Sequence, residues 1–228
     1  MQDLAHPWNV SLGEAAEIQR RLRDRVVPHP PAGFTARHVA GADISIERGS
    51  DRAFAGVVVI DAATMETVEQ ASAVVEVHFP YVPGLLSFRE LPAVTQVWER
   101  LRDKPDVLIF DGVGYAHPRR FGLACHGGVI LGVPSIGCAK SILVGTHGPL
   151  GEARGSTAEL VHRGEVVGMA VRLRERTQPV YVSIGHLIDL STAVEVVLSM
   201  GTGYRQPETT RRAHRLVNDL RREDAAAG

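Results

Sequence analysis

The sequence predicts an α/β protein in which a mixed β-sheet carries helices on both faces. Two observations support this fold class. The first third of the chain contains three strand-like segments joined by short turns, and the remainder alternates helix-like segments with short apolar ones. Strands joined by short turns pair antiparallel, whereas strands separated by a helix can return in parallel. Because no repeat, linker or change of composition divides the chain, we expect one domain over residues 1–228.

An amphipathic helix is expected first, over residues 11–26. Ala15, Ile18 and Leu22 recur there at helical spacing, and Ser11 with Glu14 fits a capping box. Three strands are expected next, around residues 42–44, 55–60 and 68–77, and their short connections predict an antiparallel meander.

The rest of the chain predicts alternating helices and strands. Helices are expected at residues 94–103, 121–131, 192–200 and 207–223, strands at 106–110, 135–138 and 180–184, and a hairpin over 160–173, with a frayed tail from 224 to 228. The strand over 106–110 is almost wholly apolar, as in strands buried on both faces, and it stops at Asp111; the strand over 135–138 ends at Lys140. Ligands of such sheets lie beyond the carboxyl ends of parallel strands, so both residues mark a candidate site.

Composition and motifs exclude several classes of function. The 25 Lys and Arg residues balance 26 Asp and Glu residues, so attraction to nucleic acid must come from a local patch. Cys125 and Cys138 lie in apolar stretches, which argues against a disulfide framework or a zinc knuckle. No signal peptide or membrane span is recognisable, and we expect a cytoplasmic monomer that does not contact membranes. The GxxxxGK[ST], GxSxG, GxGxxG and HExxH patterns are absent.

Two aspartates are candidates for a metal site. Asp43 interrupts an apolar strand, where an unpaired carboxylate is costly to bury, and Asp111 ends a buried strand beside Gly112. Two carboxylates at the rims of central strands form a hard oxygen site that suits Mg²⁺ or Mn²⁺. Asp43 taken alone has another interpretation, in which it lies on an open face of the sheet or caps a neighbouring loop.

Glu90 and His214 each have two interpretations. Glu90 either completes the metal site or forms a capping box with Ser87, ahead of Pro92 in the first helical turn. His214 lies at the edge of an apolar helical stripe, which by itself favours a packing role over a catalytic one.

A stiff turn is predicted at Pro80, Tyr81, Val82 and Pro83, because the two prolines fix φ on either side of the aromatic ring. Such a turn either packs on the core or fills the gap left by an unstacked base. Candidates for phosphate contacts, equally readable as solvated surface residues, are Arg89, Arg119, Arg120 and Arg205.

Four segments of the sequence resemble the endonuclease V family, which cleaves DNA at deaminated bases. They are FPYVPGLLSFRELP (79–92), FDGVGYAHPRRFGLACHGGVILGVPSIGCAKS (110–141), PVYVSIGHLI (179–188) and YRQPETTRRAH (204–214). The resemblance runs in the family order over most of the chain, from about the first helix to His214. It implies a ribonuclease H-like fold, which agrees with the mixed sheet expected above.

The resemblance also implies a role for individual residues. Asp43 and Asp111 would hold Mg²⁺, for which Mn²⁺ substitutes, and Glu90, Lys140 and His214 would complete the catalytic group. The wedge would be Pro80, Tyr81, Val82 and Pro83, and the pocket for the flipped base would be Gly84, Leu86, Gly112, His117 and Gly122. The implied reaction is hydrolysis of the second phosphodiester bond on the 3′ side of deoxyinosine, which leaves a 3′-hydroxyl and a 5′-phosphate.

Two other functions stay open from the sequence alone. A binding module would recognise modified nucleic acid without cutting it, and the loss of either metal aspartate would favour it; both are present. A nuclease of the same fold could instead act mainly on inosine-containing RNA, a choice that depends on contacts with the 2′-hydroxyl. DNA with deaminated bases is therefore the expected partner, and inosine-containing RNA is the alternative.

Overall fold

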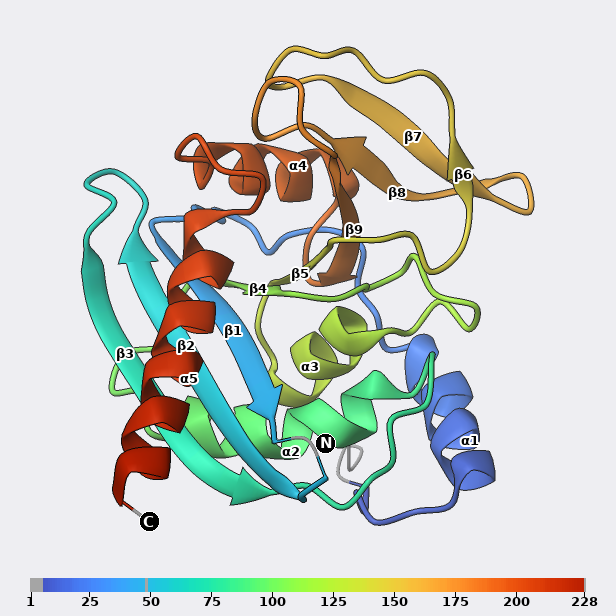
Figure 1. Ribbon diagram of the computed structural model, residues 1–228. Coiled ribbons are helices and arrows are strands. Elements are labelled where there is room, and N and C mark those ends of the chain that lie inside the picture. Colours follow the sequence, from blue (N-terminus) through green and yellow to red (C-terminus); the bar gives the residue numbers. More distant parts are fainter. Residues whose placement is uncertain (1–5, 48, 228) are drawn as a thin grey trace.

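A computed structural model describes residues 6–47 and 49–227, and within them nine strands form one mixed sheet (Figure 1). The strand order is β3-β2-β1-β4-β5-β9-β8-β7-β6. Antiparallel pairing joins β1 (His38–Ile46), β2 (Arg52–Asp61) and β3 (Thr67–Glu76), as the short turns predict. In contrast, β4 (Val107–Phe110) pairs in parallel with β1 and with β5 (Ser135–Ala139).

The sheet continues past β5 with antiparallel strands. β9 (Val180–His186) pairs with β5, and β8 (Glu165–Val171), β7 (Thr157–His162) and β6 (Thr146–His147) follow towards the edge. β7 and β8 form the hairpin expected over 160–173, and it turns at Arg163 and Gly164. The two-residue strand β6 is an addition to the predicted elements, and it is too short to carry a period-2 pattern.

Helices cover both faces of the sheet, which confirms the predicted fold class. α2 (Leu86–Glu99) and α3 (Leu123–Leu131) pack on one face, in a core with alternate residues of β1, β2 and β4. The intervening strand residues point to the other face, where α4 (Leu190–Ser199) and α5 (Glu208–Ala227) lie. α1 (Leu12–Arg23) begins with the predicted Ser11–Glu14 capping box and contacts α3.

The start of α5 comes close to β1, and a glycine makes that approach possible. A Cβ atom at Gly41 would lie 2.4 Å from the carbonyl carbon of Thr209, which is far inside van der Waals contact. Asp43 lies two residues after Gly41 in β1, and His214 lies further along α5 from Thr209. Both are predicted site residues. In Figure 1, α5 crosses β1 and β2 along its whole length.

Two helices, α2 and α5, differ most from the sequence prediction. α2 begins at Leu86, its cap residue Leu85 makes no side-chain hydrogen bond, and Pro92 lies inside the helix. Of the two interpretations of Glu90, the capping box with Ser87 is therefore wrong: the Ser87 hydroxyl is hydrogen-bonded to His126 Nδ1 at 2.9 Å instead. The frayed tail predicted over 224–228 is also wrong for residues 224–227, which α5 includes, and Gly228 lies outside the described residues.

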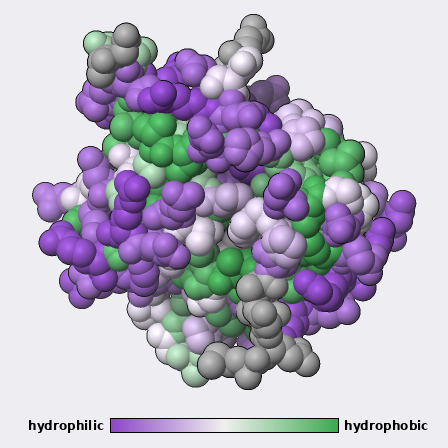
Figure 2. Space-filling model, turned by 90° about the horizontal axis from the view of Figure 1, so that it is seen from below, coloured by the Kyte–Doolittle hydropathy of each residue, from purple (hydrophilic) through white to green (hydrophobic). Residues whose placement is uncertain are grey.

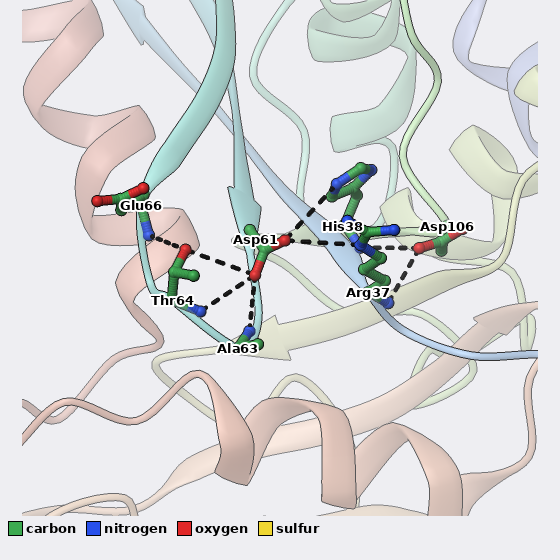
Figure 3. A network of polar contacts seen from close by, with 7 residues as sticks. All are labelled: Arg37, His38, Asp61, Ala63, Thr64, Glu66 and Asp106. Atoms are coloured by element: carbon green, nitrogen blue, oxygen red, sulfur yellow. Dashed lines mark hydrogen bonds and ion pairs between the residues drawn. The ribbon is translucent and has the colours of Figure 1, made fainter.

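A polar network ties together the amino ends of β1 and β4 (Figure 3). One carboxylate oxygen of Asp106, directly before β4, accepts hydrogen bonds from the backbone N–H groups of Arg37 at 3.0 Å and His38 at 2.7 Å. At the end of β2, Asp61 accepts from the backbone of Ala63 and Thr64 at 2.9 and 3.1 Å. The Asp61 bonds close the turn between β2 and β3, and the Asp106 bonds join the start of β1 to the start of β4. Backbone donors therefore hold this end of the sheet.

The surface mixes polar and apolar residues. On the face seen from below in Figure 2, hydrophilic residues cover much of the surface and hydrophobic areas lie between them. Among the described residues, no helix combines the length and the hydrophobicity that crossing a membrane requires.

Candidate functional site

The carboxyl ends of three neighbouring strands bring the predicted acidic residues together. Asp43 lies in β1, Asp111 directly follows β4, and Lys140 directly follows β5. Ala42 is the register partner of Phe110, so the next residues on the two parallel strands, Asp43 and Asp111, are neighbours across the sheet. Adjacent strands are about 4.8 Å apart, which is close enough for both carboxylates to face one small ion.

Three side chains, those of Lys140, Gln206 and His214, contact these aspartates. Lys140 Nζ lies 2.5 Å from one carboxylate oxygen of Asp111, and Gln206 Nε2 donates to the same oxygen at 3.5 Å. His214 Nδ1 is 2.8 Å from a carboxylate oxygen of Asp43. His214 comes from α5, so the packing of this helix over β1 decides that contact. The interpretation of His214 as a packing residue alone is therefore wrong.

Glu90 joins the same group from α2, on the opposite face of the sheet. Burial, together with the negative charges of Asp43 and Asp111, raises its pKa to about 8, and the positive charge of Arg89 opposes this shift. Burial also raises the pKa of Asp43; the hydrogen bond from His214 opposes this effect and the charge of Asp111 adds to it. Three carboxyl groups thus lie close together, and the charges of Asp43 and Asp111 disfavour ionisation of Glu90.

A cavity of about 370 Å³ opens at this end of the sheet. Its lining includes most of the residues that the sequence predicts for the site: Asp43, Tyr81, Val82, Pro83, Gly84, Leu86, Glu90, Asp111, Gly112, His117, Gly122 and Lys140. Two predicted residues are outside the lining. Pro80 precedes the loop that reaches the cavity, and His214 approaches it through Asp43.

The loop predicted as a wedge stands at the mouth of this cavity. Tyr81 is 70% exposed, so its ring does not pack into the core. The loop ends at Gly84, whose positive φ of 81° suits glycine, and whose carbonyl oxygen accepts from His117 Nε2 at 2.9 Å. Burial lowers the pKa of His117 to about 4, so the ring is neutral at pH 7. Its Nδ1 accepts from the backbone N–H of Arg119, which leaves the Nε2 proton for Gly84.

The four arginines considered for phosphate contacts all bind protein acceptors. Arg89 donates to the carbonyl of Phe79 and Arg205 to that of Lys140. Arg120 pairs with Glu165, and Arg119 donates to the carbonyl of Gly84 at 2.7 Å. These arginines therefore order the loops around the cavity rather than standing free in solvent.

Sequence reasoning missed some of the cavity lining. Gln19 of α1 lines it together with Ser87, Val113, Leu123, Ala139, Ser141 and Leu143. For Gln19 a signal was available, because it shares the buried helix face with Ala15 and Leu22, where a polar residue is unexpected. The apolar lining residues carry no comparable signal.

Comparison with known proteins identifies the family. The chain matches the family described as Endonuclease V over residues 20–215. Endonuclease V of Myxococcus xanthus is 66% identical over 220 residues, covering 96% of this chain and 94% of that protein. The chain belongs to the endonuclease V family. It is therefore a member of a family of nucleases.

Solved structures of endonuclease V share the fold. The crystal structure of the Streptomyces avermitilis protein superposes with a TM-score of 0.89 at 43% identity, covering 96% of each chain. This likeness confirms the predicted ribonuclease H-like fold. Endonuclease V of Ciona intestinalis, crystallised with a 24mer DNA containing an inosine followed by a ribo-adenosine, matches with a TM-score of 0.82 at 26% identity, over 93% of this chain and 98% of that one.

No complete set of metal ligands is preassembled in the endonuclease V site. Within residues 6–47 and 49–227, no three His, Cys, Asp or Glu side chains are gathered in a way that would hold a metal ion by themselves. The neighbouring carboxylates of Asp43 and Asp111 are the hard oxygen donors of the site.

Proposed function

We propose that this chain is a Mg²⁺-dependent endonuclease that nicks DNA at deoxyinosine and other deaminated bases. In this proposal it hydrolyses the second phosphodiester bond on the 3′ side of the lesion and leaves a 3′-hydroxyl and a 5′-phosphate. One observation carries the proposal: the acidic residues, Lys140, the exposed Tyr81 loop and the predicted base pocket all line one cavity. The Ciona relative bound to inosine-containing DNA supports the choice of substrate.

The donor chemistry of the site fits Mg²⁺. Asp43 and Asp111 would hold the ion, and Mn²⁺ would substitute for it. Mg²⁺ usually takes one or two carboxylates and fills its other positions with water and substrate phosphate, so two aspartates without a third protein ligand suffice. The mutual repulsion of the clustered carboxyl groups favours binding of a divalent cation. When bound, the ion would stabilise charge that develops on the phosphate and help to activate water.

The remaining residues would orient substrate and handle protons. His214 holds Asp43 through Nδ1, which fixes the direction of that carboxylate. Lys140 pairs with Asp111 and is 45% exposed, so its ammonium group can also approach a phosphate of bound DNA. Glu90, with a pKa of about 8, is able to hold a proton near neutral pH in the absence of a cation.

Recognition would depend on base flipping. Tyr81 would occupy the gap that the flipped base leaves, since its exposed ring is held at the end of a stiff turn. The base would enter the pocket formed around Gly84, Leu86, Gly112, His117 and Gly122. Flipping costs a few kcal/mol and is easiest for a weakly paired base, so mispaired inosine itself contributes to selectivity.

Inosine-containing RNA is a second candidate substrate. The DNA bound to the Ciona relative has a ribonucleotide directly after the inosine, so that protein accepts a ribose at this position. A binding module that does not cut is the weaker alternative, because both aspartates are in place beside Lys140.

Matched oligonucleotides would test the proposal. We would incubate DNA and RNA duplexes carrying a single inosine, and the same duplexes with adenine, with Mg²⁺ or with EDTA. We expect nicking of inosine-containing DNA in Mg²⁺, none in EDTA, and none with the Asp43→Ala variant. Tight binding of inosine-containing DNA without any nicking would support the binding module, and faster cleavage of the RNA would support the second candidate. Nicking by wild type in EDTA would contradict the metal assignment.

A further inference from the structure

Gln19 is a buried polar side chain in the middle of α1. It is 1% exposed and shares its helix face with the apolar residues Ala15, Ile18 and Leu22. A buried amide is costly unless its donors and acceptors are satisfied. The contacts of Gln19 therefore indicate why an amide lies at this position.

The Gln19 amide makes three hydrogen bonds to two separate loops. Its Nε2 donates to the carbonyl of Gly84 at 3.0 Å and to the carbonyl of Phe121 at 3.1 Å. Its Oε1 accepts from Arg119 Nε at 2.6 Å. Because carbonyls only accept and a guanidinium only donates, this environment allows a single orientation of the amide.

These partners connect the wedge to the base pocket. Gly84 ends the wedge loop, Phe121 directly precedes the pocket residue Gly122, and Gln19 itself lines the cavity between them. The partners are 65 and 102 residues away from Gln19 in the sequence. The carbonyl of Gly84 also accepts from His117 and Arg119, which lie in the loop of residues 113–123 that carries part of the base pocket, here called the pocket loop. The two loops and α1 therefore meet at one carbonyl oxygen.

We propose that Gln19 is a positioning residue for base discrimination, which fixes the wedge loop against the pocket loop before substrate binds. This inference rests on the proposed function, because discrimination here means the preference for inosine-containing DNA over undamaged DNA. A preformed pocket lowers the ordering cost of binding the flipped base, whereas undamaged DNA, which places no base there, gains nothing from it. The loss of Gln19 would therefore weaken binding of inosine-containing DNA more than it slows cleavage of bound DNA.

Three variants separate positioning from stability. Gln19→Leu removes all three hydrogen bonds at similar volume, and Gln19→Glu retains an acceptor for Arg119 but loses both donors. Ile18→Val is the matched control, because it removes one methylene from the adjacent buried position of α1 and no hydrogen bond. None of the three substitutions touches the acidic residues.

The first readout is steady-state kinetics on an inosine-containing duplex and on the same duplex with adenine. For Gln19→Leu and Gln19→Glu we expect the ratio of the two kcat/KM values to fall about tenfold, mainly through KM for the inosine duplex. We expect Ile18→Val to lower Tm while the ratio stays at the wild-type value. An unchanged ratio in Gln19→Leu, or an equal fall in Ile18→Val, would overturn the proposal.

The second readout is hydrogen–deuterium exchange of the free protein, which does not depend on activity. We expect residues 79–88 and 113–123 to exchange about tenfold faster in Gln19→Leu and at the wild-type rate in Ile18→Val. If wild type fails to prefer inosine, the proposed function fails and base discrimination fails with it, while exchange still decides whether Gln19 joins the loops. Unchanged exchange in Gln19→Leu would reject that link.

Discussion

Carboxylates lie at both ends of β1 and β4, and their surroundings differ. At the amino ends, Asp106 and the neighbouring Asp61 accept hydrogen bonds from backbone N–H groups (Figure 3). Hydrogen bonds from the backbone of Thr64 and Ala63 lower the pKa of Asp61. At the carboxyl ends, burial raises the pKa of Asp43, and burial with two like charges raises that of Glu90 to about 8.

The difference shows how one residue type serves structure at one end and chemistry at the other. Backbone donors are part of the fold, so the carboxylates that they bind are committed to holding this end of the sheet together. The partners of Asp43 and Asp111 are the side chains His214 and Lys140, which are 61% and 45% exposed and therefore accessible to a ligand. A cluster of carboxyl groups whose partners are accessible side chains is suited to bind a cation.

The largest expected effect comes from Asp111→Asn. If this carboxylate holds Mg²⁺, nicking of inosine-containing DNA should fall about 10³-fold, since metal coordination supplies several kcal/mol of transition-state stabilisation. Stability should stay close to wild type, because the lost ion pair with Lys140 is partly exposed and repulsion with Asp43 and Glu90 is relieved. Single-turnover nicking and thermal unfolding would be measured in parallel. Wild-type activity in this variant would remove Asp111 from the metal site.

The opposite pattern is expected for Asp106→Ala at the other end of β4. The backbone N–H groups of Arg37 and His38 would lose their acceptor, which costs about 2 kcal/mol of unfolding free energy. Asp106→Asn, which retains one acceptor oxygen, is the control and should lose less. Urea unfolding measures the cost, and nicking at a temperature where the variant is folded should match wild type. A large loss of activity at that temperature would contradict the separation of the two ends.

A pH dependence of stability follows from Glu90. Its pKa is about 8 in the folded protein and near 4.5 when unfolded, so the unfolded chain releases its proton first as pH rises. In EDTA, the unfolding free energy should therefore decrease between about pH 4.5 and 8. Because Glu90 is half-buried, we expect a decrease on the order of 2 kcal/mol. Glu90→Gln should remove this part of the dependence, and Mg²⁺ should reduce it in wild type. Urea unfolding across this pH range measures the dependence. If the unfolding free energy changes with pH equally in wild type and in Glu90→Gln, the assignment is rejected.

Much of the fold could be predicted because local patterns and tertiary structure agree. The turns between β1, β2 and β3 are short, and the apolar run before Asp111 fits a strand covered on both faces. The start of α2 could not be predicted in this way. Ser87 and Glu90 have the spacing of a capping box, but Ser87 instead contacts His126, which comes from α3, and such a partner is invisible to local sequence.

The site was predictable in part, for the same reason. Asp43 and Asp111 could be placed because carboxyl ends of parallel strands share one edge of a sheet. The contact between His214 and Asp43 depends on how α5 crosses β1 at Gly41, which no local pattern reveals. The strand-end position of Lys140 and the stiff turn around Tyr81 made both residues candidates, and the family resemblance implied their specific roles.

The smallest expected effect sharpens the comparison at the carboxyl end, between residues that cleave and residues that recognise. Tyr81 is 70% exposed, so Tyr81→Ala should leave the unfolding free energy and Mg²⁺ binding unchanged. Its ring would no longer fill the gap beside the flipped base, and the preference for inosine over adenine should fall about tenfold, since stacking on a base contributes 1–3 kcal/mol. Tyr81→Phe keeps the ring and should keep the preference. Competition binding of the two duplexes in Ca²⁺, followed by nicking in Mg²⁺, would separate recognition from cleavage. An equal preference for inosine in Tyr81→Ala and wild type would assign the wedge role to another residue.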